Sequence, residues 1–373
     1  MRIALVNLTG GGLSGGYIKY LRQLVPVMRR HPGIKELFVF LPTAFRSLLE
    51  KELPPEACLP CQDTGRGRAE LRQKILQLLP DVVFFPTFRW LDCGRIPTVA
   101  MIRNMESLLL PFGDNRLVDA AKNLLRAYSA RRACRKAGRV IAVSHFVKDF
   151  LTNSWQIPAD KIGVVSHGVQ APPPIENLSR PPALHPEWAG NFWFTAGSIR
   201  PYRGLEDIIE ALGRLQARGQ RVPLVIAGAA SRLTHSYQKK IEALAVQQGV
   251  ARQIFWAGHL SEAEMSWCYY HSKIFLMTSR IEACPNVALE ALSHGCLCLA
   301  ADNPPLPEFF QGAAIYYRAG QADSLEKASA AALGLTAAEE AELRTRARRQ
   351  GQKFSWEETA ERTFRELELA AGR

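Results

Sequence analysis

The sequence predicts an α/β protein made of two parallel-sheet domains. At 373 residues the chain exceeds the ~250 residues at which single cores stop growing, so two domains of ordinary size are expected. In both halves, short β-branched or aromatic runs alternate with helical patterns, as in parallel strands covered by helices. Between the halves, residues 171–186 read APPPIENLSRPPALHP and hold six prolines. Because proline lacks an amide donor and fixes φ, this stretch is predicted to be a linker.

The first domain is predicted to span residues 1–170 and the second residues 187–353. The strands predicted in the first domain are Ile3–Asn7, Leu37–Leu41, Val82–Phe85, Thr98–Ile102, Val140–Val143 and Gly163–Val165. Those predicted in the second are Phe192–Ala196, Leu224–Ala227, Ile254–Ala257, Ile274–Met277 and Cys296–Ala300. In residues 354–373, apolar side chains recur at helical spacing, and we expect a terminal helix there that packs back on the first domain.

The composition is that of an ordinary globular protein. Hydrophobic residues at 47% and charged residues at 22% exclude disorder and fibrous repeats. No apolar run approaches the ~20 residues of a membrane span, and the first residues lack the features of a secretory signal, so a cytoplasmic location is predicted.

The eight cysteines are expected to be small buried hydrophobes in a reducing compartment. Cys58 and Cys61 form one CxxC in a proline-rich loop, and without a second pair we predict a plain loop and no metal.

The excess of positive charge lies in the first half of the sequence. Residues 1–180 hold 26 basic and 14 acidic residues, whereas residues 181–373 hold 21 of each. The strongly basic segment 116–139 is predicted to be a helix with an apolar stripe formed by Leu117, Ala121, Leu124 and Tyr128. Such a helix either docks on an anionic membrane or an anionic acceptor, or packs its stripe on the sheet and leaves its arginines solvated. Nucleic acid is not expected, since the basic residues are not interleaved with aromatic stacking motifs.

Residues 279–295, SRIEACPNVALEALSHG, are predicted to leave a strand and open a helix. Pro285 suits the first turn and Gly295 the C-terminal end. The amides around Asn286 and Val287, with the positive end of the helix dipole, would then suit a diphosphate at the carboxyl edge of the sheet.

Two glutamates of this segment are candidate ligands. Glu290 would lie about one turn into the helix, where it can accept hydrogen bonds from ribose hydroxyls, and Glu282 lies in the loop. Solvated surface glutamates often have such spacing by chance. The apolar neighbours of Glu290 nevertheless indicate a largely buried helix, in which an unpaired carboxylate is costly.

Residues 196–212, AGSIRPYRGLEDIIEAL, carry two arginines in the loop after a predicted strand. Arg200 and Arg203 suit a diphosphate, because a guanidinium gives two parallel charge-assisted hydrogen bonds. The alternative is a pair of solvated loop arginines.

A glycine loop, TGGGLSGG at residues 9–16, follows the first predicted strand. Its Gly-x-Gly-x-x-Gly spacing alone would suggest a nicotinamide or flavin dinucleotide site. Such a site expects an acid at the end of the second strand, but here Leu37–Leu41 runs into Pro42 and Thr43. An NAD-linked oxidoreductase is therefore disfavoured.

Together these segments resemble the retaining glycosyltransferases of family GT4, which have the GT-B fold, and the resemblance covers nearly the whole chain. The family's two donor-binding elements read here GSIRPYRG and EACPNVALE. Further matching stretches are HGCLCLAADNPPLPE, IAVSHFVKDFL, KIGVVSHGV and FSWEETAERTF.

The resemblance implies two Rossmann-like domains that face each other across a cleft. It also implies retaining transfer of a sugar from a UDP- or GDP-sugar to a glycan or lipid-linked acceptor, in cell-surface polysaccharide or glycolipid synthesis, without a cofactor or obligatory metal. The implied catalytic residues are Arg203, on the diphosphate, and Glu282, beside the transferred sugar. The substrate-binding residues are Gly11, Gly12, Arg103, Arg200, Cys284, Pro285, Asn286, Val287 and Glu290.

The sequence departs from the family pattern at two places. Ser198 stands where many members have arginine, and Arg103 stands where many have a histidine.

Two alternatives to a transferase remain: a GT-B-like sugar-nucleotide epimerase, and a catalytically silent protein that binds a nucleotide sugar or a polyanion. Product analysis without acceptor separates the epimerase.

Overall fold

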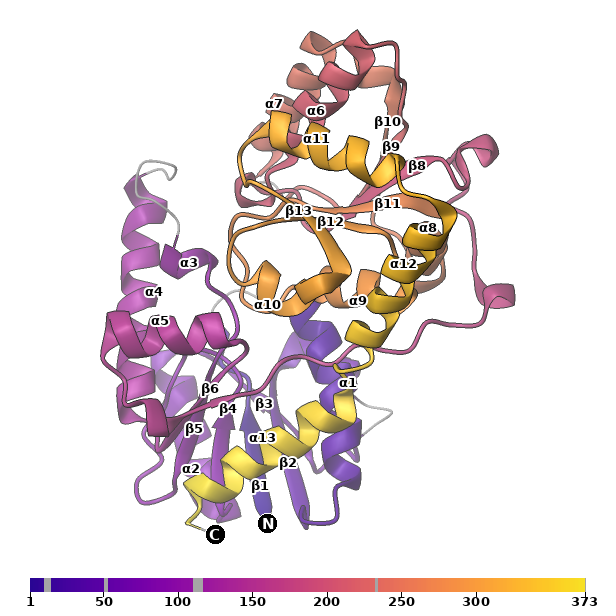
Figure 1. Cartoon of the computed structure of the whole chain (residues 1–373). Coiled ribbons are helices and arrows are strands. Elements are labelled where there is room, and N and C mark those ends of the chain that lie inside the picture. The colour runs from indigo at the N-terminus through magenta and orange to yellow at the C-terminus, as the bar shows by residue number, and fades with distance from the viewer. Residues whose placement is uncertain (10–14, 50–52, 110–116, 232–233, 373) are drawn as a thin grey trace. The chain divides into compact units, whose positions relative to one another are not determined.

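The computed structural model describes residues 1–9, 15–49, 53–109, 117–231 and 234–372, and gives only the backbone at residues 46 and 117–120. The chain divides into two compact units. Unit 1 comprises Met1–Gly168 and Ser355–Arg373, and unit 2 comprises Val169–Phe354. Each unit is an α/β layer structure in its own right (Figure 1).

Unit 1 is built on a parallel sheet whose strand order in the described residues is β3-β2-β1-β4-β5-β6-β7. The strands are β1 (Arg2–Val6), β2 (Glu36–Pro42), β3 (Cys58–Cys61), β4 (Val82–Phe85), β5 (Thr98–Ile102), β6 (Arg139–Ala142) and β7 (Ile162–Val164). Both β4 and β5 are buried along their whole length, as expected for a sheet covered on both faces. The six strands predicted for this half are confirmed within about one residue at each end.

The seventh strand, β3, corrects the prediction of a plain loop at the CxxC pair. Val39 pairs with Cys58 and Pro42 with Cys61 in a parallel ladder. Pro60 is tolerated because β3 lies at the edge of the sheet, where an outward-facing residue needs no amide donor. Both thiols are buried. In the described part of the chain, no group of three or more His, Cys, Asp or Glu side chains could hold a metal ion.

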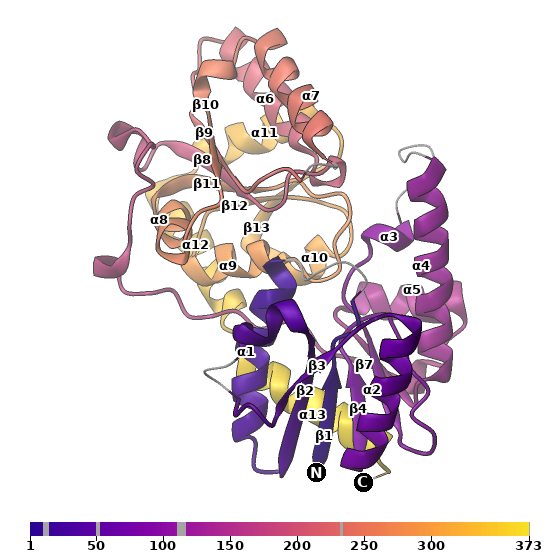
Figure 2. The same cartoon turned by 180° about the vertical axis from the view of Figure 1, so that it is seen from behind.

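The helices of unit 1 lie on both faces of its sheet. They are α1 (Gly15–Arg30), α2 (Gly65–Leu78), α3 (Glu106–Leu109), α4 (Leu117–Lys136), α5 (His145–Trp155) and α13 (Trp356–Ala370). Helix α13 crosses one face of the sheet and α2 covers the opposite face (Figures 1 and 2). Leu367 of α13 is fully buried, and Glu366 accepts hydrogen bonds from Nε and Nη2 of Arg139 at 2.8 and 2.6 Å. The last described helix is therefore an integral part of unit 1.

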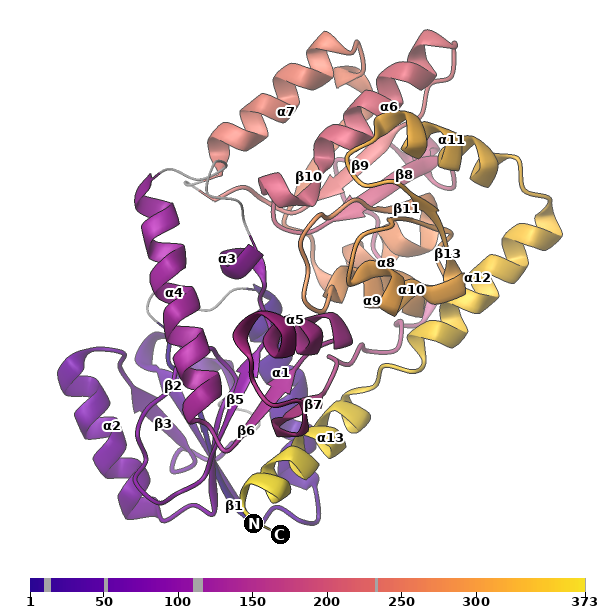
Figure 3. The same cartoon turned by 60° about the vertical axis from the view of Figure 1, so that its left-hand side comes forward.

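Helix α4 is attached to unit 1 by its C-terminal half. That half is buried through Ala130, Ala133 and Cys134. The N-terminal half extends beyond the sheet (Figure 3), and Leu124 and Tyr128 are 60% and 67% exposed. The interpretation that the apolar stripe packs on the sheet is therefore wrong for these two residues, because the helix faces the sheet with its small residues instead.

Unit 2 is built on a second parallel sheet, of order β10-β9-β8-β11-β12-β13 in the described residues. The strands are β8 (Phe192–Ala196), β9 (Leu224–Ala227), β10 (Ile254–Gly258), β11 (Ser272–Met277), β12 (Cys298–Ala301) and β13 (Ala314–Tyr317). The five predicted strands are confirmed within about two residues, and β13 was not predicted. The strand β13 is only partly buried at three of its four residues, so it lacks the continuous apolar run of a central strand.

Two helical layers cover this sheet (Figure 1). One layer contains α6 (Leu205–Ala217), α7 (His235–Gln247) and α11 (Ala322–Leu333). The other contains α8 (Glu262–His271), α9 (Asn286–His294), α10 (Leu306–Phe310) and α12 (Ala337–Gly351). The proline-rich stretch 171–186 belongs to unit 2, where Leu184 is buried in the core. In the ranges that the structure describes, no helix is both long and apolar enough to cross a membrane.

Candidate active site

The loop after β8 places Arg203 at the carboxyl edge of the unit 2 sheet. Gly197 lies directly after β8 with φ +128°, a conformation that favours glycine. A Cβ atom added there would lie 2.8 Å from Cζ of Arg203, so the missing side chain lets the guanidinium rest on the backbone. The chain then makes a short 3₁₀ turn, Pro201–Arg203, and Gly204 at φ +63° precedes α6.

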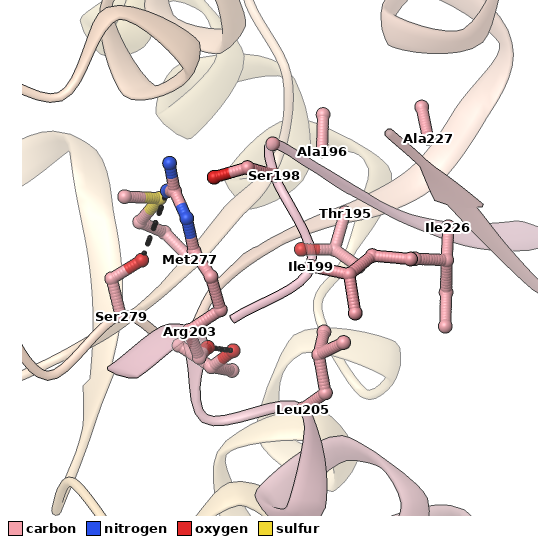
Figure 4. Close-up of a pocket in the computed structure, with 12 residues that line it drawn as sticks. Thr195, Ala196, Ser198, Ile199, Arg203, Leu205, Ile226, Ala227, Met277 and Ser279 are labelled. Atoms are coloured by element: carbon pink, nitrogen blue, oxygen red, sulfur yellow. Dashed lines mark hydrogen bonds between the residues drawn. The ribbon is translucent and has the colours of Figure 1, made fainter. Parts of the chain in front are cut away.

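Arg203 is held from two sides. Its Nη1 donates to Oε1 of Glu282 at 2.7 Å and to Oγ of Ser279 at 3.2 Å. Its carbonyl accepts from Oγ1 of Thr278 at 2.7 Å. Figure 4 shows the guanidinium extending along a pocket toward Ser198 and Ser279. Since the Arg203 and Glu282 side chains are only 17% and 12% exposed, their ion pair is well shielded from water.

Helix α9 begins where the predicted diphosphate site lies. Pro285 is its N-cap residue, Asn286 and Val287 form its first turn, and Gly295 ends it in the left-handed region at φ +69°. Cys284 and Pro285 are buried. The positive end of this helix dipole is thus at the carboxyl edge of the sheet, just after the Glu282 loop, which is the arrangement that attracts phosphate.

Glu290 lies about one turn into α9 and has a partner that the sequence did not indicate. The hydroxyl of Tyr269, on α8, donates to Oε2 of Glu290 at 2.9 Å. The Tyr269 ring is 1% exposed and stacks on His294 with centroids 4.9 Å apart. Burial and the neighbouring Glu290 carboxylate raise the pKa of Tyr269 well above its ordinary value, so the hydroxyl remains a donor.

Arg103 belongs to unit 1 and lies directly after β5. Its Nε donates to the carbonyl of Pro86 at 3.0 Å, and its Cζ lies 3.5 Å from the centroid of the Tyr17 ring. Burial lowers the pKa of Arg103, although a guanidinium stays charged at neutral pH.

The structure thus brings together one group of predicted residues in unit 2. Arg203 contacts Glu282, and the segment from Cys284 to Glu290 follows in the same loop and helix. Arg200 is the partly buried N-cap residue of the 3₁₀ turn that carries Arg203. Arg103 is placed in unit 1. Gly11 and Gly12 lie outside the described residues.

Three supporting residues were missed by sequence reasoning. Ser279 lies within the quoted donor segment, but a serine at a strand end carries no distinctive signal. Tyr269 and Tyr17 come from helices remote in sequence from Glu290 and Arg103, so no spacing rule could connect them. Only the tertiary structure reveals these pairs.

The two parallel-sheet units define a GT-B fold, and solved structures share it. HepE from Anabaena, in complex with UDP, is 18% identical; the match covers 99% of this chain and 100% of HepE with a TM-score of 0.76. WaaG, a glycosyltransferase involved in lipopolysaccharide biosynthesis, is 14% identical, with 100% of both chains covered and a TM-score of 0.67.

The sequence also matches two family models. Residues 187–354 match the model described as Glycosyl transferases group 1, and residues 37–171 match Glycosyltransferase Family 4. Together the two models cover most of the chain, which is therefore a glycosyltransferase with a group 1 domain at residues 187–354. The serotype-specific mannosyltransferase WbdA of Escherichia coli is 24% identical over 351 residues, which cover 85% of this chain. The chain spans only 41% of that relative's length.

Proposed function

We propose that this glycosyltransferase moves a sugar, with retention of configuration, from a nucleotide diphosphate sugar to a glycan or lipid-linked acceptor in polysaccharide or glycolipid synthesis. The observation that carries the proposal is the Arg203–Glu282 pair beside the start of α9. A fixed cation, a carboxylate and a helix N-terminus lie in one loop system at the carboxyl edge of a group 1 domain. The solved complexes of HepE with UDP and with UDP-glucose support a nucleotide-sugar donor.

In this proposal Arg203 and Arg200 bind the diphosphate together with residues 284–287, which lead into α9 and begin it. Glu290 accepts hydrogen bonds from the ribose, and Glu282 lies beside the transferred sugar. In unit 1, Gly11, Gly12 and Arg103 contact the sugar or the acceptor.

The ion pair of Arg203 suggests how the donor enters. A diphosphate carries more negative charge than one carboxylate, so it competes with Glu282 for the guanidinium. Charge builds up on the leaving diphosphate during transfer, and donors already in place lower the barrier. Because Arg203 and the helix dipole supply positive charge, we propose neither a cofactor nor an obligatory metal.

Donor binding tests this proposal. We expect one of UDP-, GDP- or ADP-sugars to stabilise the folded chain, by ~2.7 kcal/mol at about 100 times its dissociation constant. Glu290→Ala removes a charge-assisted hydrogen bond, so donor affinity should fall by roughly 10- to 150-fold, corresponding to ~1.5–3 kcal/mol.

The chain offers a matched control for this variant. Glu206 accepts from Tyr237 at 2.7 Å in the same unit, as Glu290 accepts from Tyr269. Glu206→Ala should leave donor affinity unchanged. Equal donor binding by folded Glu290→Ala would overturn the donor site, and an epimerised donor formed without acceptor would overturn transfer.

We also propose that α4 docks on an anionic lipid bilayer, which places a cytoplasmic enzyme near lipid-linked acceptors. Leu124, Leu125 and Tyr128 are 60–69% exposed, and Lys122 and Arg126 beside them are exposed as well. This is the mixture of apolar and basic side chains that suits a membrane interface. Each basic residue near such a surface contributes ~1 kcal/mol, which salt weakens.

Vesicle sedimentation tests the docking of α4. We expect binding to vesicles of phosphatidylcholine mixed with phosphatidylglycerol at low salt, but not to phosphatidylcholine alone. Lys122→Glu with Arg126→Glu should abolish it without changing nucleotide affinity. Arg349→Glu with Lys353→Glu, the same charge change at exposed sites of unit 2, is the control. Equal binding to both vesicle types would contradict the proposal.

A further inference from the structure

Arg103 lies at the topological switch point of the unit 1 sheet. Strands β1 and β4 are neighbours in the sheet order, and the chain continues from β1 to β2 on one side and from β4 to β5 on the other. In open α/β sheets, ligands bind in the crevice that this divergence leaves at the carboxyl ends of the strands. Arg103 spans the divergence: its Nε donates to Pro86, directly after β4, and its guanidinium lies over Tyr17, on the helix that follows β1.

The support beneath this guanidinium is rigid. Tyr17 is fully buried, and its hydroxyl donates to Oδ1 of Asn7. Asn7, also fully buried, donates from Nδ2 to the carbonyl of Phe40 at 2.8 Å. One face of the Arg103 guanidinium and its Nε are therefore fixed, and the terminal nitrogens keep one orientation. A donor group held in place beforehand pays little ordering entropy when a ligand binds.

Arg103 lacks the counter-charge that its neighbours have. Along the same edge, Arg68 donates from Nε to Oδ1 of Asp63 at 2.6 Å, and Arg89 pairs with the other oxygen of Asp63. Within the described ranges, no aspartate or glutamate forms an ion pair with Arg103. The titratable side chains beside it, Tyr17 and Tyr20, are neutral because burial raises the pKa of both. Burying part of a cation without a carboxylate partner costs desolvation free energy. An anionic ligand can supply the missing negative charge.

We infer that the switch-point crevice of unit 1 binds a sugar that carries an oxyanion, a carboxylate or a phosphate, and that Arg103 is the residue that recognises it. This inference rests on the proposed function and names the substrate class for the unit 1 side of the reaction. A guanidinium matches a carboxylate or phosphate through two parallel hydrogen bonds, whereas a neutral hydroxyl offers no charge. Unit 1, Met1–Gly168 with Ser355–Arg373, holds 28 basic and 18 acidic residues, and this excess attracts the same class of ligand.

Binding of simple probes to the full chain tests the inference. D-glucuronate and glucose 6-phosphate carry the two oxyanions, and D-glucose is the neutral match. Each is titrated at constant ionic strength in saturating UDP or GDP, whichever binds, so that the diphosphate site of unit 2 is occupied. We expect at least one anionic probe to bind about tenfold or more tightly than glucose.

Variants assign this preference to Arg103. Arg103→Met should abolish it, and Arg103→Lys should keep part of it as a point charge. Arg72→Met is the control, because the Nε of Arg72 also donates to a backbone carbonyl at 3.0 Å, at an exposed site of unit 1. The melting temperature of Arg103→Met should not fall much, since no described carboxylate loses its partner. A large fall together with an unchanged preference for anions would show a purely structural arginine and overturn the inference.

Turnover identifies which substrate carries the oxyanion. One arm compares a uronate donor with its neutral hexose counterpart, and the other compares acceptors that end in glucuronate and in glucose. We expect a preference for the charged substrate in one arm, lost in Arg103→Met and retained in Arg72→Met. If nucleotide binds but no arm or probe prefers an anion, the inference fails while the proposed function stands. If no nucleotide binds, the proposed function fails whatever the anion probes show.

Discussion

Two guanidinium groups at sheet edges, one in each unit, differ in what balances their charge. Arg203 of unit 2 has a carboxylate from its own unit at 2.7 Å. Arg103 of unit 1 lies 3.5 Å over an aromatic ring, with no ion pair to a described acid. A paired cation must exchange its partner when a phosphate arrives, whereas a cation on a ring adds a partner. An arginine at a sheet edge can therefore be held either by a carboxylate, which a ligand must displace, or by an aromatic ring, which leaves the guanidinium able to accept a further anionic partner.

The largest effect is expected when Arg203, the arginine that is paired with a carboxylate, is replaced. Arg203→Ala should lower kcat by about 10²–10³, because the cation is proposed to oppose charge that grows on the leaving diphosphate, and should raise KM as well. Arg203→Lys should keep part of the activity as a point charge. Steady-state kinetics with the donor sugar measure both constants.

The control for Arg203 is another ion pair of unit 2. Arg218 lies 2.7 Å from Glu326 and is 69% exposed, and Arg218→Ala should leave both constants unchanged. If Arg203→Ala raised KM and left kcat alone, Arg203 would bind the ground state and transition state equally, and its catalytic role would be wrong.

A smaller effect is expected from the glycine beneath Arg203. Gly197→Ala places a methyl group 2.8 Å from the guanidinium carbon at φ +128°, so it should displace Arg203 and also cost about 1 kcal/mol or more of unfolding free energy. Gly190→Ala, at φ +82° with no atom within 4 Å of the added carbon, has the backbone strain without the clash. Only Gly197→Ala should weaken donor binding in calorimetry. Equal weakening by both variants would mean that strain, not the position of Arg203, controls affinity.

The smallest effect is expected when Glu290 loses its hydrogen bond from the neutral Tyr269 hydroxyl. Tyr269→Phe removes the hydroxyl that donates to Glu290 and should raise the donor KM about three- to tenfold with little change in kcat, since Glu290 is proposed to bind the ribose far from the bond that breaks. Tyr237→Phe, which removes the same bond to Glu206, should alter stability but not KM. A fall in kcat alone for Tyr269→Phe would contradict this role.

The sequence predicted the central strands well because they are short apolar runs buried on both faces, as at Val82–Phe85. It failed at the sheet edges, where β3 is only half-buried at Leu59 and Pro60 and β13 is mostly half-buried. Proposed donor-site residues that lie close together in sequence, such as Glu282 and Asn286, were predicted from local pattern and family resemblance. Side chains that position them from other helices, such as Tyr269, did not, because a tertiary contact leaves no mark on the sequence around either partner.

The position of α13 has a consequence for how the molecule is made. This helix is synthesised after all of unit 2, yet it belongs to unit 1. There Glu361 contacts His31 at 3.0 Å, and the centroid of the Phe364 ring lies 4.0 Å from that of the His31 ring. As the chain leaves the ribosome, unit 2 has its full complement of residues first, while the earlier-synthesised unit 1 still exposes the apolar surface that α13 covers. A chain that ended near residue 355 would therefore keep the proposed donor-binding residues of unit 2 and lack a helix of unit 1. Synthesis therefore begins with unit 1, but unit 2 is the first of the two units to have all its residues.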